Sequence, residues 1–170
     1  MTFNRRAFLA SSGATFAAAS AGGFFGPSSA SAQSAESNSP NEQPVIGYIG
    51  TGIRYHTALG SGGMAFGPCA KIADVDSVQA GRALQKAMDI HREKNRPLDV
   101  VVREDYRDVL DDDKIDIVII ASPDHWHTKQ VVEALQAGKD VYCEKPLTLT
   151  IEEGTMIEDA IKKTGGIVQV

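Results

Sequence analysis

From Val45 onward, short runs of apolar residues alternate with longer stretches in which apolar positions recur at helical spacing. Such alternation is typical of βαβ units, in which helices connect the parallel strands of one sheet. Residues 117–121 (IVIIA) are continuously apolar, as expected of a strand that is buried on both faces. The pattern predicts an α/β fold whose parallel sheet is covered by helices on both sides.

Six strands are predicted, at residues 45–50, 69–75, 99–102, 116–121, 140–143 and 167–170. Helices are predicted at residues 77–94, 106–110, 125–137 and 151–163, the last preceded by a capping box of Thr150 and Glu153. Gly60 to Gly63 interrupt the stretch between the first two strands, so the helix expected there is short or displaced. Right-handed crossovers then give a doubly wound sheet in the order 3-2-1-4-5-6, whose ligands bind beyond the carboxyl ends of the strands.

The first 32 residues have the features of a removable export signal. Arg5 and Arg6 form a charged pair, residues 7–25 are mildly apolar, and Ala30-Ser31-Ala32 matches a cleavage site. The pattern resembles the twin-arginine signal, and it predicts a periplasmic or otherwise exported protein that uses the twin-arginine export machinery. An uncleaved membrane anchor is the less favoured alternative, because seven of the 19 residues in the apolar run are Ser, Thr or Gly.

Residues 33–44 contain no large apolar side chain, so a flexible linker is predicted there. Residues 45–170 are enough for one domain with one core. The chain has 17 basic and 22 acidic residues, and removal of the two signal arginines leaves 15 basic residues and changes the formal net charge from −5 to −7. An acidic domain without a basic stripe argues against nucleic acid as a partner.

Only two cysteines are present, Cys69 and Cys143, and both fall in predicted strands. A free cysteine in such a position behaves as a small hydrophobic residue. A disulfide between the two is the less favoured alternative, and the sequence leaves the pairing open.

Gly50-Thr51-Gly52 directly follows the first predicted strand. Glycines at these positions permit a tight turn and bring backbone amides against the pyrophosphate of a dinucleotide at a helix N-terminus. Tyr55 occupies the position of the third glycine in the GxGxxG pattern, which implies looser packing between helix and strand. An ordinary glycine turn explains the two glycines equally well.

Asp74 lies near the end of the second predicted strand, 22 residues after Gly52. An acidic side chain at about this spacing accepts hydrogen bonds from the adenosine ribose, and its charge repels a 2′-phosphate, so NAD is favoured over NADP. The alternative is that Asp74 or Asp76 only caps the following helix. We prefer Asp76 as the cap and Asp74 as the ribose ligand.

Residues 122–127 (SPDHWH) follow the fourth predicted strand. His125 and His127 are two residues apart at the start of a helix and cannot share a face, so no metal site is predicted. The favoured interpretation is a wall of the cofactor cleft, with Ser122 and Pro123 next to the adenylate or ribose and His127 turned inward. Trp126 is expected in the core.

Glu144-Lys145-Pro146 follows the fifth predicted strand. An ammonium group at this point can stabilise an alkoxide or assist proton transfer from a hydroxyl-bearing carbon. For the tripeptide alone, a surface Glu–Lys pair before a turn proline is the simpler explanation. Taken together, the motifs favour a functional site over a surface ion pair, because the glycine turn, Asp74, Ser122 and Lys145 all fall at carboxyl ends of predicted strands.

These motifs resemble the Gfo/Idh/MocA family of glucose-fructose oxidoreductase and inositol dehydrogenase. The resemblance covers residues 45–170, and its most specific parts are residues 104–107 (EDYR), 122–127 (SPDHWH) and 137–147 (AGKDVYCEKPL). It implies a dinucleotide-binding Rossmann domain in which Lys145 is catalytic, Glu144 contacts the nicotinamide end of the cofactor, and the peptide bond before Pro146 is often cis. The family's Asn/Asp-x-x-His element falls on Asp124 and His127.

The resemblance also implies a second α/β domain, which would bind substrate, supply further catalytic residues and form homo-oligomer interfaces. That domain is missing from these 170 residues, so the chain is expected to be a fragment that binds dinucleotide weakly and is inactive by itself. The intact protein is expected to be an exported NAD-dependent oxidoreductase acting on a sugar, inositol or related polyol. An NAD-dependent glycoside hydrolase of the same family and a non-catalytic dinucleotide-binding module are the alternatives.

Overall fold

A computed structural model describes residues 43–97 and 99–170 of the chain. The predicted signal peptide and all but the last two residues of the predicted linker lie outside the described residues. Within the described residues, no helix combines the length and the apolar character needed to cross a membrane.

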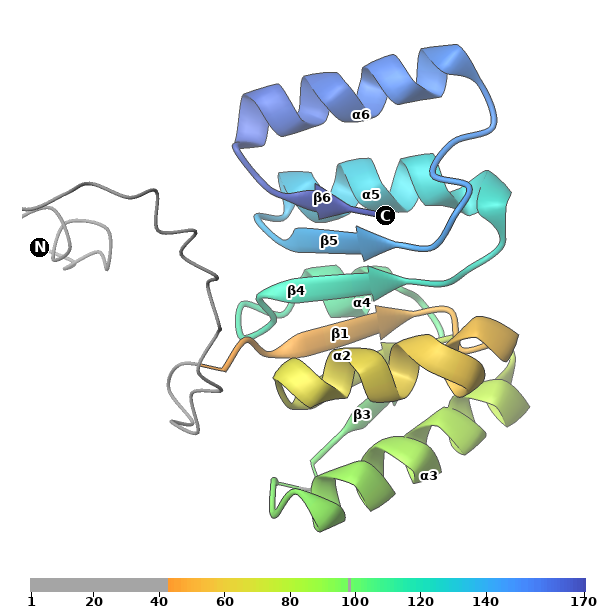
Figure 1. Ribbon diagram of the computed structural model, residues 1–170, viewed down its shortest axis with the longest axis vertical. Coiled ribbons are helices and arrows are strands. Elements are labelled where there is room, and N and C mark those ends of the chain that lie inside the picture. The colour runs from red at the N-terminus through yellow and green to blue at the C-terminus, as the bar shows by residue number, and fades with distance from the viewer. Residues whose placement is uncertain (1–42, 98) are drawn as a thin grey trace, which may run out of the picture. The chain divides into compact units, whose positions relative to one another are not determined.

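The described part of the chain contains one six-stranded sheet in which every pair of neighbouring strands is parallel. The strand order is β3-β2-β1-β4-β5-β6, which confirms the predicted doubly wound topology (Figure 1). The strands are β1 (Ile46–Ile49), β2 (Cys69–Ala73), β3 (Val101–Arg103), β4 (Ile117–Ile120), β5 (Asp140–Cys143) and β6 (Val168–Gln169). The order reverses between β1 and β4, and a crevice opens at such a point beyond the carboxyl ends of the strands.

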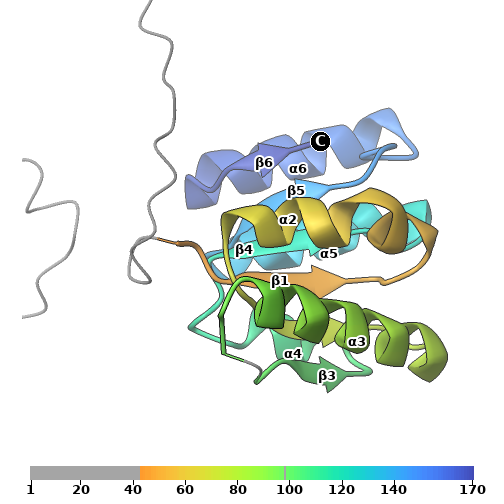
Figure 2. The ribbon, with the colours of Figure 1, turned by 60° about the horizontal axis from the view of Figure 1, so that its bottom comes forward.

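Helices cover both faces of the sheet (Figures 1 and 2). One face carries η1 (Tyr55–Leu59), α2 (Gly60–Phe66) and α3 (Ser77–Glu93), which pack with Tyr48, Ile72 and Ile119 in one core cluster. The other face carries α4 (Arg107–Leu110), α5 (His127–Gln136) and α6 (Ile151–Thr164), which pack around Val118 and Ile120. A short 3₁₀ turn, η2 (Asp124–Trp126), precedes α5. Residues of β4 lie in both clusters, so this strand is buried on both faces, which explains why its residues are continuously apolar.

The segment around Gly60 does not interrupt a helix, so the predicted short or displaced element is wrong. The chain is helical from Ile53 through Phe66, with a π-helical turn at η1 that passes into α2. A Cβ atom on Gly63 would lie 2.3 Å from Ile119 Cδ1 and 2.4 Å from Tyr48 Oη. The glycine therefore lets the helix approach the sheet closely, and the hydroxyl of Tyr48 donates a 3.0 Å hydrogen bond to the Gly60 carbonyl.

The predicted helix boundaries are confirmed where capping signals define them. Asp76 caps α3, since its Oδ1 accepts from the backbone N–H of Val78 at 2.8 Å and of Gln79 at 3.3 Å. Thr150 and Glu153 form the predicted capping box before α6.

Cys69 in β2 and Cys143 in β5 are both free and buried, as their expected role as small hydrophobic residues requires. Two strands, β1 and β4, separate them in the sheet, so the fold keeps the thiols apart. Burial raises the pKa of the Cys143 thiol to about 12 and raises that of Cys69 further. Both side chains are therefore protonated hydrophobic residues at neutral pH.

Candidate functional site

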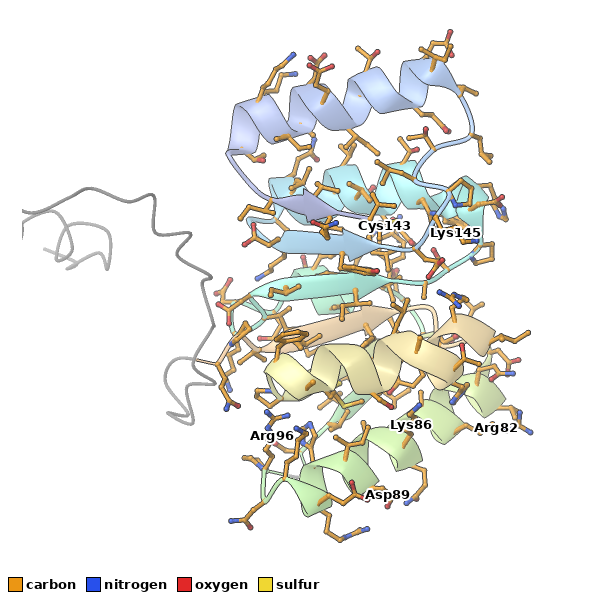
Figure 3. The ribbon with its side chains drawn as sticks, viewed as in Figure 1. Arg82, Lys86, Asp89, Arg96, Cys143 and Lys145 are labelled. Carbon is orange, nitrogen blue, oxygen red and sulfur yellow. The ribbon has the colours of Figure 1, made fainter. Side chains whose placement is uncertain are left out.

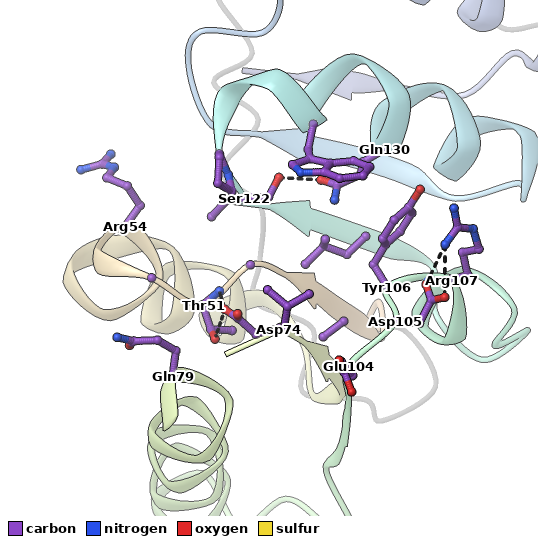
Figure 4. Close-up of a pocket in the computed structure, with 18 of the residues that line it drawn as sticks. Thr51, Arg54, Asp74, Gln79, Glu104, Asp105, Tyr106, Arg107, Ser122 and Gln130 are labelled. Atoms are coloured by element: carbon purple, nitrogen blue, oxygen red, sulfur yellow. Dashed lines mark hydrogen bonds and ion pairs between the residues drawn. The ribbon is translucent and has the colours of Figure 1, made fainter. Parts of the chain in front are cut away.

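A cleft of about 990 Å³ opens at the carboxyl ends of β1, β2 and β4, where the strand order reverses (Figure 4). It is lined from three sides by the turn after β1, the end of β2 with the start of α3, and the segments that follow β3 and β4. The residues that line it are Ile49, Gly50, Thr51, Gly52, Ile53, Arg54, Ala73, Asp74, Val75, Gln79, Glu104, Asp105, Tyr106, Arg107, Ala121, Ser122, Pro123, Trp126 and Gln130.

The turn after β1 has two glycines with different roles. Gly50 has a φ of +81°, and a Cβ atom there would lie 2.5 Å from the backbone nitrogen of Ser122. Glycine is therefore needed where the ends of β1 and β4 meet. Apart from its two chain neighbours, no residue has atoms within 4 Å of the Cβ position of Gly52, so a ligand can reach the backbone there. The turn leads into the helix that begins at Ile53, which places free amide groups next to the cleft.

Asp74 fixes the same turn from the neighbouring strand. Its Oδ2 accepts hydrogen bonds from the Thr51 backbone N–H at 2.6 Å and from the Thr51 hydroxyl at 2.7 Å. Its Oδ1 accepts from the Asp76 N–H at 2.9 Å. An ionised carboxylate accepts about four hydrogen bonds, so Asp74 retains capacity for a ligand hydroxyl. Thr51 is fully buried and holds the turn through Asp74.

An aromatic wall faces the glycine turn across the cleft. The rings of Tyr106 and Trp126 lie 6.4 Å apart in an edge-on arrangement, and the Arg107 guanidinium stacks 4.9 Å from the centre of the Tyr106 ring. Burial together with the bond that the Tyr106 hydroxyl donates to Glu133 raises the pKa of Tyr106 to about 12. Trp126 is 41% exposed and lines the cleft, so its expected place in the core is wrong.

This wall was missed by sequence reasoning, although its segment carries a family motif (EDYR). Tyr106 and Trp126 follow different strands, and no spacing rule links them. Only the parallel arrangement of β3 and β4 in the sheet brings the two segments to the same end of the fold.

Ser122 and Pro123 line the cleft as predicted, and the Ser122 hydroxyl donates a 2.6 Å hydrogen bond to the side chain of buried Gln130. His127 does not line the cleft, which corrects its expected place in the wall. It is 1% exposed, with Nδ1 2.7 Å from the Pro146 carbonyl oxygen and Nε2 2.9 Å from that of Ser122. The imidazole therefore ties the loop after β4 to the loop after β5.

Glu144 and Lys145 directly follow β5 and are not among the residues that line the cleft. Figure 3 shows Lys145 beyond the end of β5. The Glu144 N–H donates to the Ile120 carbonyl at 2.9 Å, which continues the pairing of β5 with β4. The Glu144 carboxylate accepts a 3.0 Å hydrogen bond from Arg54 Nε, whereas Lys145 is exposed. The peptide bond between Lys145 and Pro146 is cis, in accord with the family resemblance.

Apart from His127, the predicted site residues divide into two groups at one end of the sheet. The cleft contains Gly50, Thr51, Gly52, Asp74, Ser122 and Pro123. Glu144 and Lys145 extend the site beyond β4, and Arg54 joins the two groups because it lines the cleft and binds Glu144. Within the described ranges, no group of three or more metal-ligating side chains occurs.

The topology and the glycine turn define a dinucleotide-binding doubly wound domain. Residues 45–170 match the Gfo/Idh/MocA family, described as an oxidoreductase family with an NAD-binding Rossmann fold. The chain belongs to this family, and these residues form its NAD-binding Rossmann domain.

Individual relatives agree with this assignment. Over 103 residues the chain is 39% identical to the scyllo-inositol 2-dehydrogenase (NAD(+)) of Bacillus subtilis (strain 168), a match covering 61% of this chain and 28% of the relative. Over 74 residues it is 43% identical to a glycosyl hydrolase family 109 protein of Shewanella sp. (strain W3-18-1), covering 42% of this chain and 16% of the relative. The 3-ketoreductase KijD10 from Actinomadura kijaniata, solved with NADP and TDP-benzene, shares the fold with a TM-score of 0.63 at 22% identity, covering 74% of this chain and 36% of that one.

Proposed function

We propose that the protein is an oxidoreductase that transfers hydride between NAD and a sugar, inositol or related polyol. The observation that carries the proposal is the placement of Lys145 and Glu144 at the same end of the sheet as the cleft, joined to it by Arg54. The 39% identical relative is named an inositol dehydrogenase, which supports the substrate class. The chain spans 28% of that relative's length, and we expect substrate contacts in a further domain of the protein.

The residues of the cleft fit a bound NAD. The backbone at Gly52 is open to a pyrophosphate, Asp74 has capacity for a ribose hydroxyl, and Tyr106 and Trp126 offer aromatic surface. When bound, NAD supplies the acceptor for the hydride, which is chemistry that no side chain provides. Glu144 orients the nicotinamide end, and Lys145 takes part in proton transfer at the substrate hydroxyl.

Asp74 is expected to favour NAD over NADP. In the variant Asp74→Ser the loss of charge removes the repulsion of a 2′-phosphate and one acceptor for the ribose, so the ratio of NADH to NADPH affinity should fall by about tenfold. Titration of both cofactors by fluorescence measures the ratio. The matched control is Asp76→Ser, which removes the same charge nearby but keeps a helix cap, and it should leave the ratio unchanged. An unaltered ratio in Asp74→Ser contradicts the assignment.

We propose further that the protein is exported by the twin-arginine machinery and cleaved after Ala32. The supporting observation is the order of Arg5-Arg6, the apolar run and Ala30-Ser31-Ala32 in the sequence. In the double variant Arg5→Lys and Arg6→Lys, the protein should accumulate uncleaved in the cytoplasm, while the parent should begin at Gln33. Cell fractionation and mass spectrometry of the N-terminus test this. Normal export of the double variant would exclude the twin-arginine route.

The test of the proposed activity uses the full-length product of the gene that encodes this sequence, incubated with NAD and inositols, sugars or glycosides. Net NADH formation supports the dehydrogenase. Cleavage of a glycoside without net NADH would replace it with the hydrolase alternative, which is the less favoured one because its relatives match shorter stretches of the chain. Binding without turnover on any of these compounds would indicate a non-catalytic module.

A further inference from the structure

Arg54 and Glu144 form an ion pair that links the turn after β1 to the loop after β5. Arg54 Nε lies 3.0 Å from Glu144 Oε2, although 90 positions separate the two residues in sequence. Arg54 lines the cleft, while Glu144 is next to Lys145 in the chain. The pair therefore connects the phosphate-binding end of the site with the end that carries the proposed chemistry.

The surroundings of Glu144 show why this partner matters. Its side chain is only 10% exposed, whereas that of Arg54 is 52% exposed. A carboxylate so far removed from water requires a cation or hydrogen-bond donors. Among the residues that the structure describes, Arg54 is the one cationic side chain within ion-pair distance of Glu144. Arg54 is therefore placed to fix the direction of the Glu144 carboxylate.

We propose that Arg54 is a positioning residue that holds Glu144 toward the nicotinamide end of NAD and so makes the site selective for ligands that carry a nicotinamide ring. The oxidised ring is cationic and its carboxamide has two N–H donors, so a fixed carboxylate complements both. The inference rests on the proposed function and deepens it. Arg54 occupies the fifth position of the glycine turn, where the GxGxxG pattern specifies no residue type.

The experiment compares NAD with ADP-ribose, which has the adenosine, pyrophosphate and second ribose but lacks nicotinamide. NMR titrations of the 170-residue chain measure both dissociation constants, since they remain accurate for weak binding. In Arg54→Gln, binding of NAD should weaken by about fivefold to tenfold while binding of ADP-ribose changes by less than about twofold. Arg54→Lys should restore part of the NAD affinity, because an ammonium keeps the charge but not the planar donor set.

The matched control is Arg82→Gln on α3, which removes the same charge from an exposed arginine that does not line the cleft (Figure 3). Arg82→Gln should change neither the dissociation constant for NAD nor that for ADP-ribose. Circular dichroism of all variants confirms that the fold is kept. A double-mutant cycle with Glu144→Gln adds a second readout, because two residues that act as a pair give non-additive effects on NAD affinity.

Four results would overturn the proposal while leaving the cofactor site intact. Equal weakening for NAD and ADP-ribose in Arg54→Gln would show that Arg54 acts on the pyrophosphate. Unchanged constants, additive effects in the cycle, or a parent chain with equal affinity for both ligands would show that the pair does not act on nicotinamide. A parent chain that binds neither ligand would instead refute the proposed function itself.

Discussion

Replacement of Lys145 by alanine in the full-length protein is expected to lower kcat by about a thousandfold, the usual size of a lost general acid or base. Lys145 follows β5 at the carboxyl end of the sheet and lies outside the residues that line the cleft. The dissociation constant for NADH should therefore stay within about twofold of the parent value. A large loss in kcat with intact cofactor binding is the pattern of a residue that acts on the reacting atoms.

Steady-state kinetics and fluorescence titration of NADH measure the two quantities separately. The matched control is Lys163→Ala, which removes an exposed lysine near the end of α6 and should leave both unchanged. If Lys145→Ala turns over substrate at the parent rate, Lys145 has no catalytic role, and another group must assist proton transfer at the substrate hydroxyl.

Replacement of Gly63 by alanine is expected to lower the free energy of unfolding by about 2 kcal/mol, the middle of the range for overpacked cores. The new methyl group would lie 2.4 Å from Tyr48 Oη, and the Tyr48 side chain is fully buried and hydrogen-bonded to the Gly60 carbonyl. The helix or the tyrosine must shift, and either movement weakens the packing between α2 and the sheet. Urea unfolding of the chain should show a lower midpoint with an unchanged slope.

Gly62 is the matched control for this variant. It is exposed in the same helix, and apart from its chain neighbours and the backbone of its own helix no atoms lie within 4 Å of its Cβ position. Gly62→Ala should therefore raise the free energy of unfolding by about 0.5–1 kcal/mol, because alanine restricts the unfolded chain and favours the helix. Equal effects of the two substitutions would contradict the close approach of α2 to the sheet.

The sequence by itself determined the order of the sheet and the location of the site. Strands alternating with helices admit few topologies once crossovers are right-handed, so the positions of β1 and β4 on either side of the cleft could be predicted. Rules that depend on nearby residues also succeeded: Asp76 caps α3 through amides two and three residues away, and Thr150 caps α6 through the amide of Glu153. Such capping signals depend only on residues close together in the chain, so they can be recognised without knowledge of the fold.

Contacts between distant residues were decided only by the tertiary structure. The three glycines among residues 60–66 predict a helix break, yet all three lie in α2. A larger side chain would meet Ile119 and Tyr48 of the sheet at Gly63, and Tyr55 of the preceding helical turn at Gly60. His127 was expected in the wall of the cleft, but it is buried between two loops, while the side chain of His125 is 61% exposed. The ion pair between Arg54 and Glu144 could not be predicted from the sequence. The two residues meet because the parallel strands that precede them end at the same edge of the sheet, however far apart those strands are in the chain.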